Sequence, residues 1–281
     1  MAENKLFDND TIFSLKEKIE NLRREDSLVF PLFTDLHTDS ADSESVELLC
    51  KILGTISGEI SFDMAINLGD NLAASLGRKN HITTPELEDM ANSLFGKIDA
   101  SADCPVVFVG GNHDGIGADF FKPDFWNKLT KNKSGNKTAV YDESGSYFYI
   151  DHDKSNTRLV FLSLPSDSDI SSRHPAPTWN FGSSQLRWLR DIALDTQKYV
   201  ILMVHVPLFH HYWGEPSATI KVWNGESVSD AYINALCGTI EDRSEAVDII
   251  SDFARNNPHK LIIAFSGHTH RDSNLLPFEK N

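Results

Sequence analysis

The chain has 281 residues, of which 40% are hydrophobic and 10% aromatic, a composition typical of a globular protein with a substantial core. Its formal net charge of −15 argues against binding to nucleic-acid polymers or anionic membrane surfaces, because such binding depends on Lys and Arg. The start, MAENKLFDNDTIF, lacks the basic and apolar regions of a secretory signal, and no run of about 18 apolar residues occurs, so we expect a cytoplasmic protein without membrane partners.

The N-terminal segment, residues 10–25, has the pattern of an amphipathic helix. Ile12, Leu15, Ile19 and Leu22 recur at helical spacing, with charged residues between them. We expect this helix to pack on the edge of its own domain, and a dimer contact is the alternative.

Beyond residue 27, short apolar runs alternate with helix-like stretches. The apolar runs predict strands within residues 27–37, 62–70, 105–114, 146–152, 158–165, 199–207 and 260–270. The helix-like stretches are 46–56, 85–98, 183–194 and 245–256. This alternation is typical of an α/β fold with buried strands, and the lack of repeats or long linkers predicts one domain over residues 1–281. The stretches expected to be loops that shape a cleft are 115–140, 165–182 and 209–240.

Residue types that bind metal ions follow nearly every predicted strand. They are Asp35 and His37, Asp70, Asn112 and His113, His205, and His268 and His270. In an open α/β sheet, ligands bind beyond the carboxyl ends of the strands, so these side chains are expected to converge in one cleft. A single Asp at a strand end is often only a helix N-cap, but five such ends predict a site, and buried carboxylates there need a compensating cation.

The ligand types and their number predict two metal ions. All are oxygen or imidazole-nitrogen ligands, which suit Mn²⁺, Fe or Zn²⁺, with Mn²⁺ favoured. One ion fits Asp35, His37 and His270 with Asp70, and the other fits Asn112, His205 and His268 with Asp70, so that Asp70 is the bridge. Three widely spaced cysteines, Cys50, Cys104 and Cys237, are expected to be buried free thiols rather than ligands.

The motifs resemble those of the calcineurin-like metallophosphoesterase superfamily. Its pattern is present as DLH at 35–37, GD at 69–70, GNHD at 111–114, His205 in VHVP, and GHTH at 267–270. The resemblance implies an α/β fold that is a four-layer αββα sandwich, with two mixed sheets flanked by helices and a dinuclear site at one end of the sheets. It also implies that His113 is the general acid facing the leaving group, with Asp35 or Asp114 as the partner that sets its protonation.

Departures from the pattern narrow the activity that the resemblance implies. The GD block reads GDNLAAS, with Ala73 and Ala74 where the serine/threonine protein phosphatases of the superfamily have Asp and Arg. Ala73 also stands where purple acid phosphatases have their tyrosine ligand. The pattern is most similar to that of class III cyclic-nucleotide phosphodiesterases.

We therefore expect hydrolysis of a small phosphodiester by attack of a metal-bridging hydroxide. A phosphomonoesterase of the same superfamily is the alternative, and a non-catalytic scaffold is a distant one. A monoester dianion needs extra cationic donors, for which only Arg173 and Arg271 are candidates. Candidates for contact with the substrate are His210, His211, Tyr212, Trp213 and Arg271, although the first four equally fit a packed aromatic loop; Trp179 and Trp223 are further rings that could stack on a flat group.

Overall fold

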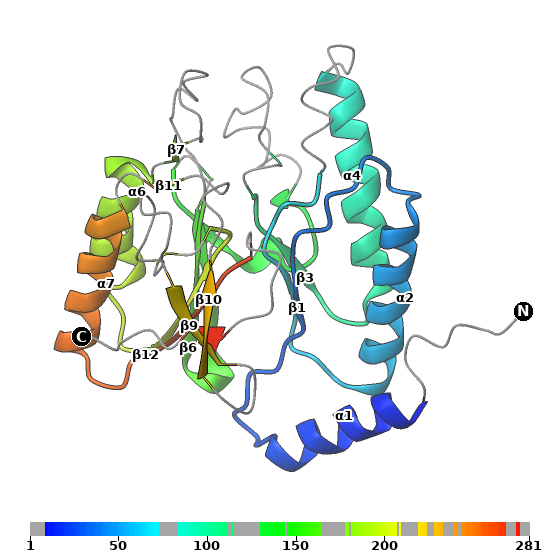
Figure 1. Ribbon diagram of the computed structural model, residues 1–281, viewed down its shortest axis with the longest axis horizontal. Coiled ribbons are helices and arrows are strands. Elements are labelled where there is room, and N and C mark those ends of the chain that lie inside the picture. The colour runs from blue at the N-terminus through cyan, green and yellow to red at the C-terminus, as the bar shows by residue number, and fades with distance from the viewer. Residues whose placement is uncertain are drawn as a thin grey trace, which may run out of the picture.

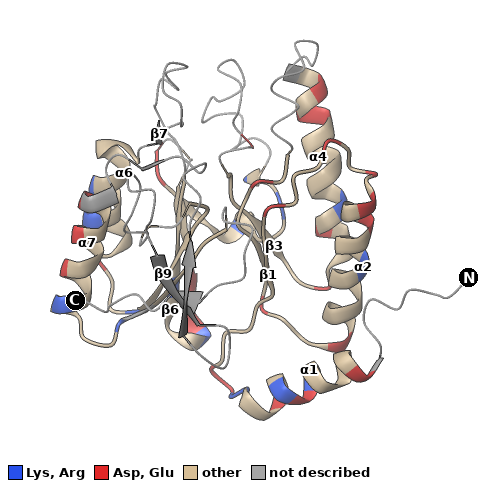
Figure 2. Cartoon of the chain, viewed as in Figure 1, with Lys and Arg blue, Asp and Glu red and all other residues tan. Residues whose placement is uncertain are grey.

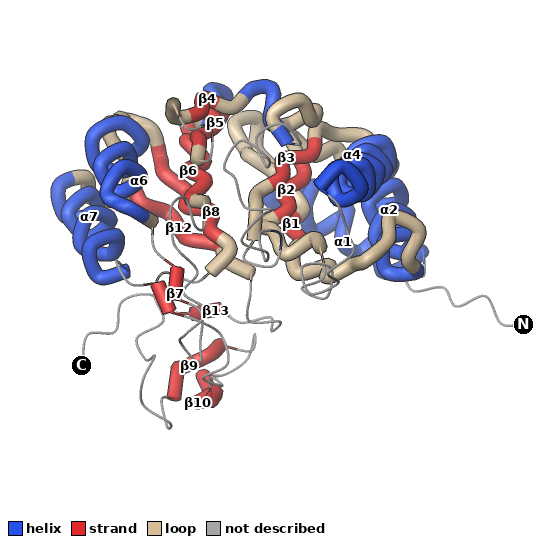
Figure 3. The backbone as a smooth tube through the Cα atoms, turned by 90° about the horizontal axis from the view of Figure 1, so that it is seen from above, coloured by secondary structure: helices blue, strands red, loops and turns tan. Residues whose placement is uncertain are grey.

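The structure is a computed structural model that describes residues 9–72, 84–111, 114, 130–143, 145, 147–163, 178–179, 181–206, 208, 219–223, 228–232, 239–240, 243–267 and 274–275. Two sheets lie face to face at its centre, and helices cover the outer face of each sheet (Figure 1). Seen from above, the order is helices, sheet, sheet, helices (Figure 3). The predicted four-layer αββα sandwich is confirmed.

The first sheet has three strands in the order β1, β2 and β3, and both pairings are parallel. These strands span Leu32–Phe33, Ala65–Asn67 and Val106–Phe108. Helices α2 (Glu44–Glu59) and α4 (Thr84–Ser101) cover its outer face. Two mixed sheets were expected, but the described strands of this sheet form parallel pairs alone. The apolar residues between helices and sheet include Val46, Leu53, Leu94, Phe95 and Phe108.

The second sheet has five strands in the order β12, β8, β6, β5 and β4 and is mixed. The first three strands are parallel, and β5 and β4 are antiparallel to their neighbours. The strand bounds, in that order, are Leu261–Phe265, Tyr199–Val204, Thr157–Leu162, Phe148–His152 and Val140–Tyr141. Its outer face is covered by α6 (Gly182–Trp188), a π-helical turn η4 (Leu189–Ala193) and α7 (Arg243–Asn256).

Apolar side chains fill the space between the two sheets. Ile66 and Val107 from the first sheet join Phe148, Phe161 and Met203 from the second in one buried cluster. The rings of Phe148 and Phe161 are stacked with their centroids 4.5 Å apart. Both sheets are therefore buried on two faces, which explains why their strands read as continuous apolar runs.

Four further strands lie in stretches that were expected to be loops, and a fifth follows the last predicted motif. They are β7 (Thr178–Trp179), β9 (Thr219–Trp223), β10 (Val228–Tyr232), β11 (Thr239–Ile240) and, after the last predicted motif, β13 (Asn274–Leu275). β9 pairs antiparallel with β10 and β13, and β11 pairs parallel with β7. The prediction that 165–182 and 209–240 are loops is therefore wrong where these strands lie. The strands pair with one another rather than with the strands of the two central sheets.

Helix α1 (Asn9–Leu22) lies at the end of the molecule opposite the carboxyl ends of β1–β3 (Figure 1). Ile12 is buried and Lys16 forms an ion pair with Glu59 of α2, so the expected packing on its own domain is present, although Leu22 is 80% exposed. The outer helices carry acidic and basic residues in mixture (Figure 2). None of the described helices is long and apolar enough to span a membrane.

Candidate metal centre

Side chains that follow β1 and β2 meet at the carboxyl ends of these strands. Asp35 and His37 come after β1 and Asp70 comes after β2, and one ligand atom from each lies within 4.8 Å of the other two. The His37 Nε2 atom lies 3.7 Å from Asp35 Oδ1 and 3.6 Å from Asp70 Oδ2. The side chain of His37 is 21% exposed and that of Asp70 is 1% exposed. Solvent therefore reaches this cluster at His37.

A fourth predicted ligand reaches the cluster from the other sheet. His205 follows β8, and its Nε2 atom lies 3.0 Å from Asp70 Oδ2, with both side chains buried. The Nδ1 atom lies 2.9 Å from the carbonyl oxygen of Leu68. Because a carbonyl oxygen only accepts hydrogen bonds, Nδ1 carries a hydrogen and donates it. The remaining nitrogen, Nε2, is held facing the Asp70 carboxylate, as in a histidine that binds a metal ion.

Neighbouring carboxylates raise the pKa of both histidines. Burial lowers the pKa of His205, but the hydrogen bond and the charge of Asp70 outweigh burial, so the net change is upward. For His37, the hydrogen bond with Asp35 raises the pKa and partial burial opposes it. The electric field of the cluster therefore favours positive charge at the imidazole nitrogens, which a bound divalent cation would supply.

The backbone that carries these ligands is left-handed at three of them. The φ angles of Asp35, His37 and Asp70 are 58°, 46° and 53°, and Gly69 has a φ of 100°. Parallel pairing nevertheless continues past the strands, since the N–H groups of Asp35 and His37 donate to the carbonyl oxygens of Gly69 and Asp70 at 2.9 Å. A non-glycine residue in such a conformation costs about 1–3 kcal/mol and persists only where its surroundings hold it.

Two glycines bring further segments against the same cluster. A Cβ atom on Gly111 would lie 2.2 Å from Asp70 Oδ1, and a Cβ atom on Gly267 would lie 2.7 Å from Asp35 Oδ2. The N–H of Gly267 also donates to the carbonyl oxygen of His205 at 2.9 Å. The backbone immediately before Asn112 and before His268 therefore touches the carboxylates of the centre, and only glycine permits this approach.

A buried carboxylate lies beneath the cluster. Asp114 accepts hydrogen bonds from the backbone N–H groups of Asn71, Leu72 and Gly111 at 2.8, 2.9 and 2.8 Å. Burial raises its pKa, as does the charge of Asp70, while the hydrogen bonds from Gly111 and Leu72 oppose this. Its expected partner, His113, lies outside the described residues, so that pairing stays a prediction.

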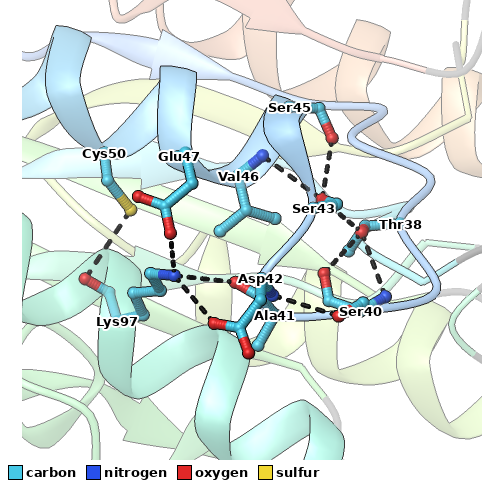
Figure 4. A network of polar contacts seen from close by, with 10 residues as sticks. All are labelled: Thr38, Ser40, Ala41, Asp42, Ser43, Ser45, Val46, Glu47, Cys50 and Lys97. Carbon is cyan, nitrogen blue, oxygen red and sulfur yellow. Dashed lines mark hydrogen bonds and ion pairs between the residues drawn. The ribbon is translucent and has the colours of Figure 1, made fainter.

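The segment after His37 is anchored on α4 (Figure 4). Lys97 donates to the carbonyl oxygen of Ala41 at 3.1 Å and to Asp42 at 3.0 Å, and it also pairs with Glu47. These hydrogen bonds raise the pKa of Lys97, that with Glu47 most. Next to this contact, Ser43 caps α2 by accepting a hydrogen bond from the N–H of Val46. The anchor fixes how the chain turns from the centre into α2.

Other predicted site residues lie outside the described residues. They are Asn112, His113, His268, His270, His210, His211, Tyr212, Trp213, Arg173 and Arg271. Trp179 and Trp223 are described in their backbone alone, on β7 and β9. Cys104 is buried and Cys50 is partly buried, both as free thiols, and Cys237 is outside the described part of the chain.

Sequence reasoning missed two buried asparagines next to the centre. Asn67 and Asn71 flank Asp70 in the sequence AINLGDN, and both are fully buried. The signal was present in the sequence, because an uncharged polar residue inside an apolar strand requires hydrogen-bond partners.

The chain is similar to known proteins in both sequence and fold. The family model of calcineurin-like phosphoesterases matches residues 30–272, which is most of the chain. The chain belongs to the calcineurin-like phosphoesterase family. This chain is similar in fold to the crystal structure of a dimetal phosphatase from Danio rerio, with a TM-score of 0.56 and 15% sequence identity. The match covers 86% of this chain and 82% of that one. A comparison of the sequence with curated proteins found no match.

Family membership agrees with the residues of the cluster. Calcineurin-like phosphoesterases hydrolyse phosphoric esters, and the phosphatase from Danio rerio that shares the fold is a dimetal enzyme. The described cluster supplies carboxylate and imidazole ligands, as such ions require.

Proposed function

We propose that this chain is a phosphoesterase with two divalent metal ions bridged by Asp70. The observation that carries the proposal is the position of Asp70 Oδ2, which lies 3.6 Å from His37 Nε2 and 3.0 Å from His205 Nε2. Those histidines follow strands of different sheets, and both ring nitrogens approach the same buried oxygen of Asp70. This arrangement fits one ion on the His37 side and one on the His205 side.

The proposed ligand sets combine described residues with residues that follow the two close-packed glycines. Asp35 and His37 join Asp70 around one ion, and His205 joins Asp70 around the other. The remaining ligands are Asn112, His268 and His270, and their neighbours Gly111 and Gly267 lie against Asp70 and Asp35, which supports these assignments. Oxygen and imidazole ligands suit Mn²⁺, Fe or Zn²⁺, with Mn²⁺ proposed first.

Two bound divalent ions supply Lewis acidity to the phosphoryl oxygens and activate water for an in-line displacement. The protein's own residues hold and orient the reacting groups. Asp70 keeps its position because its neighbours are bound to buried side chains, and the Leu68 carbonyl oxygen fixes the tautomer of His205. His113 is proposed to protonate the leaving oxygen as general acid.

A small phosphodiester is the proposed substrate. The net charge of −15 disfavours a long polyanion, and the cluster is reached by solvent at His37. The aromatic residues Tyr212, Trp213 and Trp223 are candidates to stack on a base or another flat group. The phosphomonoesterase alternative needs cationic donors beyond Arg173 and Arg271.

Metal content and turnover together test this proposal. Mass spectrometry of the purified protein should find two transition-metal ions per chain, and Mn²⁺-loaded protein should hydrolyse bis-p-nitrophenyl phosphate with a higher kcat/KM than p-nitrophenyl phosphate. A monoester preference of tenfold or more, about 1.4 kcal/mol in the transition state, would overturn the diester assignment but not the two-metal centre. A folded protein that binds no metal and has no turnover would support the scaffold alternative.

A further inference from the structure

The carboxylate of Asp114 is shared between the two loops that follow β2 and β3. Its Oδ1 atom accepts from the N–H groups of Asn71 and Leu72, and its Oδ2 atom accepts from the N–H of Gly111 and, at 3.3 Å, from Asn71 Nδ2. Asp114 is 4% exposed. All of these hydrogen bonds are donated to the carboxylate, so the charged, acceptor-only form of Asp114 matches its surroundings.

Two asparagines extend this contact to the other side of Asp70. Asn71 Oδ1 accepts from Asn67 Nδ2 at 2.7 Å, and Asn67 Oδ1 accepts from the N–H of Gly69 at 3.0 Å. Both asparagines are fully buried. The N–H group before Asp70 and those of the two residues after it therefore all donate to side chains of one connected chain of hydrogen bonds.

We propose that Asp114, Asn71 and Asn67, here called the Asp70 ladder, are positioning residues that hold Asp70 as a metal bridge. This inference rests on the proposed two-metal function. Asp70 has a left-handed φ of 53°, a conformation that persists in a non-glycine residue only where its surroundings hold it. The ladder fixes the peptides on both sides of Asp70 and joins them to Gly111, the residue that precedes Asn112 in the sequence.

The direction of every hydrogen bond in the ladder depends on the carboxylate of Asp114. In an Asp114→Asn variant, one carboxylate oxygen becomes an NH₂ group. Whichever oxygen is replaced, the NH₂ group faces a backbone N–H donor, that of Gly111 or those of Asn71 and Leu72. If Asn71 turned its amide to accept from that group, its NH₂ would face Asn67 Nδ2. Asn67 would then have to turn away from the N–H of Gly69. A change of one atom at Asp114 is thereby transmitted to the residue before Asp70.

The test compares Asp114→Asn with the wild type by calorimetric titration of the metal-free proteins with Mn²⁺. We expect the affinity for the weaker-bound ion to fall by roughly 10- to 100-fold, the usual effect of removing a residue that orients a metal ligand. At saturating Mn²⁺, KM for bis-p-nitrophenyl phosphate should stay within about threefold of the wild-type value, because Asp114 does not touch substrate, while kcat falls.

A matched control separates positioning from general destabilisation. Gln185 of α6 is also buried, and it binds the backbone N–H and carbonyl of Ser163, the residue after β6, at 2.8 and 2.9 Å. Gln185→Ala should lower the melting temperature of the metal-free protein but leave Mn²⁺ affinity within about twofold of wild type. If Asp114→Asn does not fold, Asn67→Ala takes its place and is compared with Gln185→Ala in the same way.

The outcomes separate the ladder from the proposed function. Wild-type binding of both ions by Asp114→Asn, or by Asn67→Ala in its place, would overturn the ladder and leave the two-metal centre intact. An equal loss of affinity in Gln185→Ala would also overturn it, because the effect would then follow stability alone. A wild-type protein that binds fewer than two ions would instead contradict the proposed function.

Discussion

The two sheets contribute to the centre in different ways. The three-stranded sheet supplies Asp35, His37 and Asp70 from left-handed residues after strands of two or three residues. The five-stranded sheet supplies His205 directly after β8, a strand of six residues. One side of the centre is thus built on irregular backbone held by buried polar groups, and the other is built on the end of a regular strand packed in an apolar core.

This difference indicates where the molecule stores strain for function. Left-handed backbone at three ligands costs free energy in the folded protein, and buried polar contacts such as those of Asp114 hold it in place. The five-stranded sheet has no described left-handed ligand, and its side of the centre is set by the β8 strand and the Leu68 carbonyl oxygen. We expect changes on the three-stranded side to affect metal binding most.

The largest expected effect comes from Asp70→Asn. One neutralised carboxylate weakens both proposed ion sites, so metal occupancy should fall. The kcat/KM should fall by more than about 10²-fold, because the loss of a residue that only hydrogen-bonds a metal ligand already costs up to about that factor. Asn also tolerates left-handed backbone and removes a buried charge next to Asp114, so the metal-free variant should melt at a higher temperature than the metal-free wild type. Retention of two tightly bound ions would remove Asp70 from the bridge.

The next largest effect is expected from removal of metal, which should destabilise the wild type. An ion present at 100 times its dissociation constant stabilises the folded state by about 2.7 kcal/mol, because it binds that state alone. Chelation should therefore lower the melting temperature. Hydrogen exchange should show the loss of protection at residues 35–38 and 69–72 rather than in β5 and β6. An equal loss in both sheets would contradict the asymmetry between them.

The sequence predicted the helices well because their signals are local, whereas the four layers were implied by the family resemblance. Helix α7, predicted over 245–256, spans Arg243–Asn256, and its apolar spacing needs no knowledge of its neighbours. The strands were predicted too long. The first was expected within residues 27–37, but β1 spans Leu32–Phe33, because the chain pairs onward through left-handed residues that apolar patterning does not reveal.

The residues of the candidate centre also differ in whether the sequence alone reveals them. Ligand types at strand ends were readable from the sequence, and the described Asp35, His37, Asp70 and His205 do converge. The contacts of the ladder were not, since Asn67 and Asp114 are 47 residues apart, and a polar residue in an apolar strand indicates that it has partners but not which residues they are. Only the folded chain shows that both serve the peptides around Asp70.

The same substitution at two glycines should have opposite effects within the three-stranded half. A Cβ atom at Gly111 would lie 2.3 Å from the backbone nitrogen of Asp70, whereas one at Gly96 on α4 would meet nothing within 4 Å. Gly111→Ala should cost about 1–3 kcal/mol of stability through overpacking and should weaken Mn²⁺ binding. Gly96→Ala should gain about 0.5–1 kcal/mol, since alanine is the better helix former. Chemical denaturation and metal titration measure both, and unchanged metal affinity in Gly111→Ala would show that the backbone there yields freely.

The smallest expected effect is that of Lys97→Met. Lys97 joins α4 to the segment after His37, but its partners are mostly exposed, with side-chain exposures of 89% for Asp42 and 60% for Glu47. Solvent and salt screen such pairs. The N–H of His37 is held independently by the carbonyl oxygen of Asp70 at 2.9 Å, so the position of His37 does not depend on the Lys97 anchor. We expect kcat/KM and Mn²⁺ affinity to stay within about threefold of wild type, with the difference vanishing at high salt. If kcat/KM or Mn²⁺ affinity fell tenfold or more and the loss persisted at high salt, the left-handed ligands of the three-stranded half would depend on the contacts of α4 as well as on their pairing with the segment after β2.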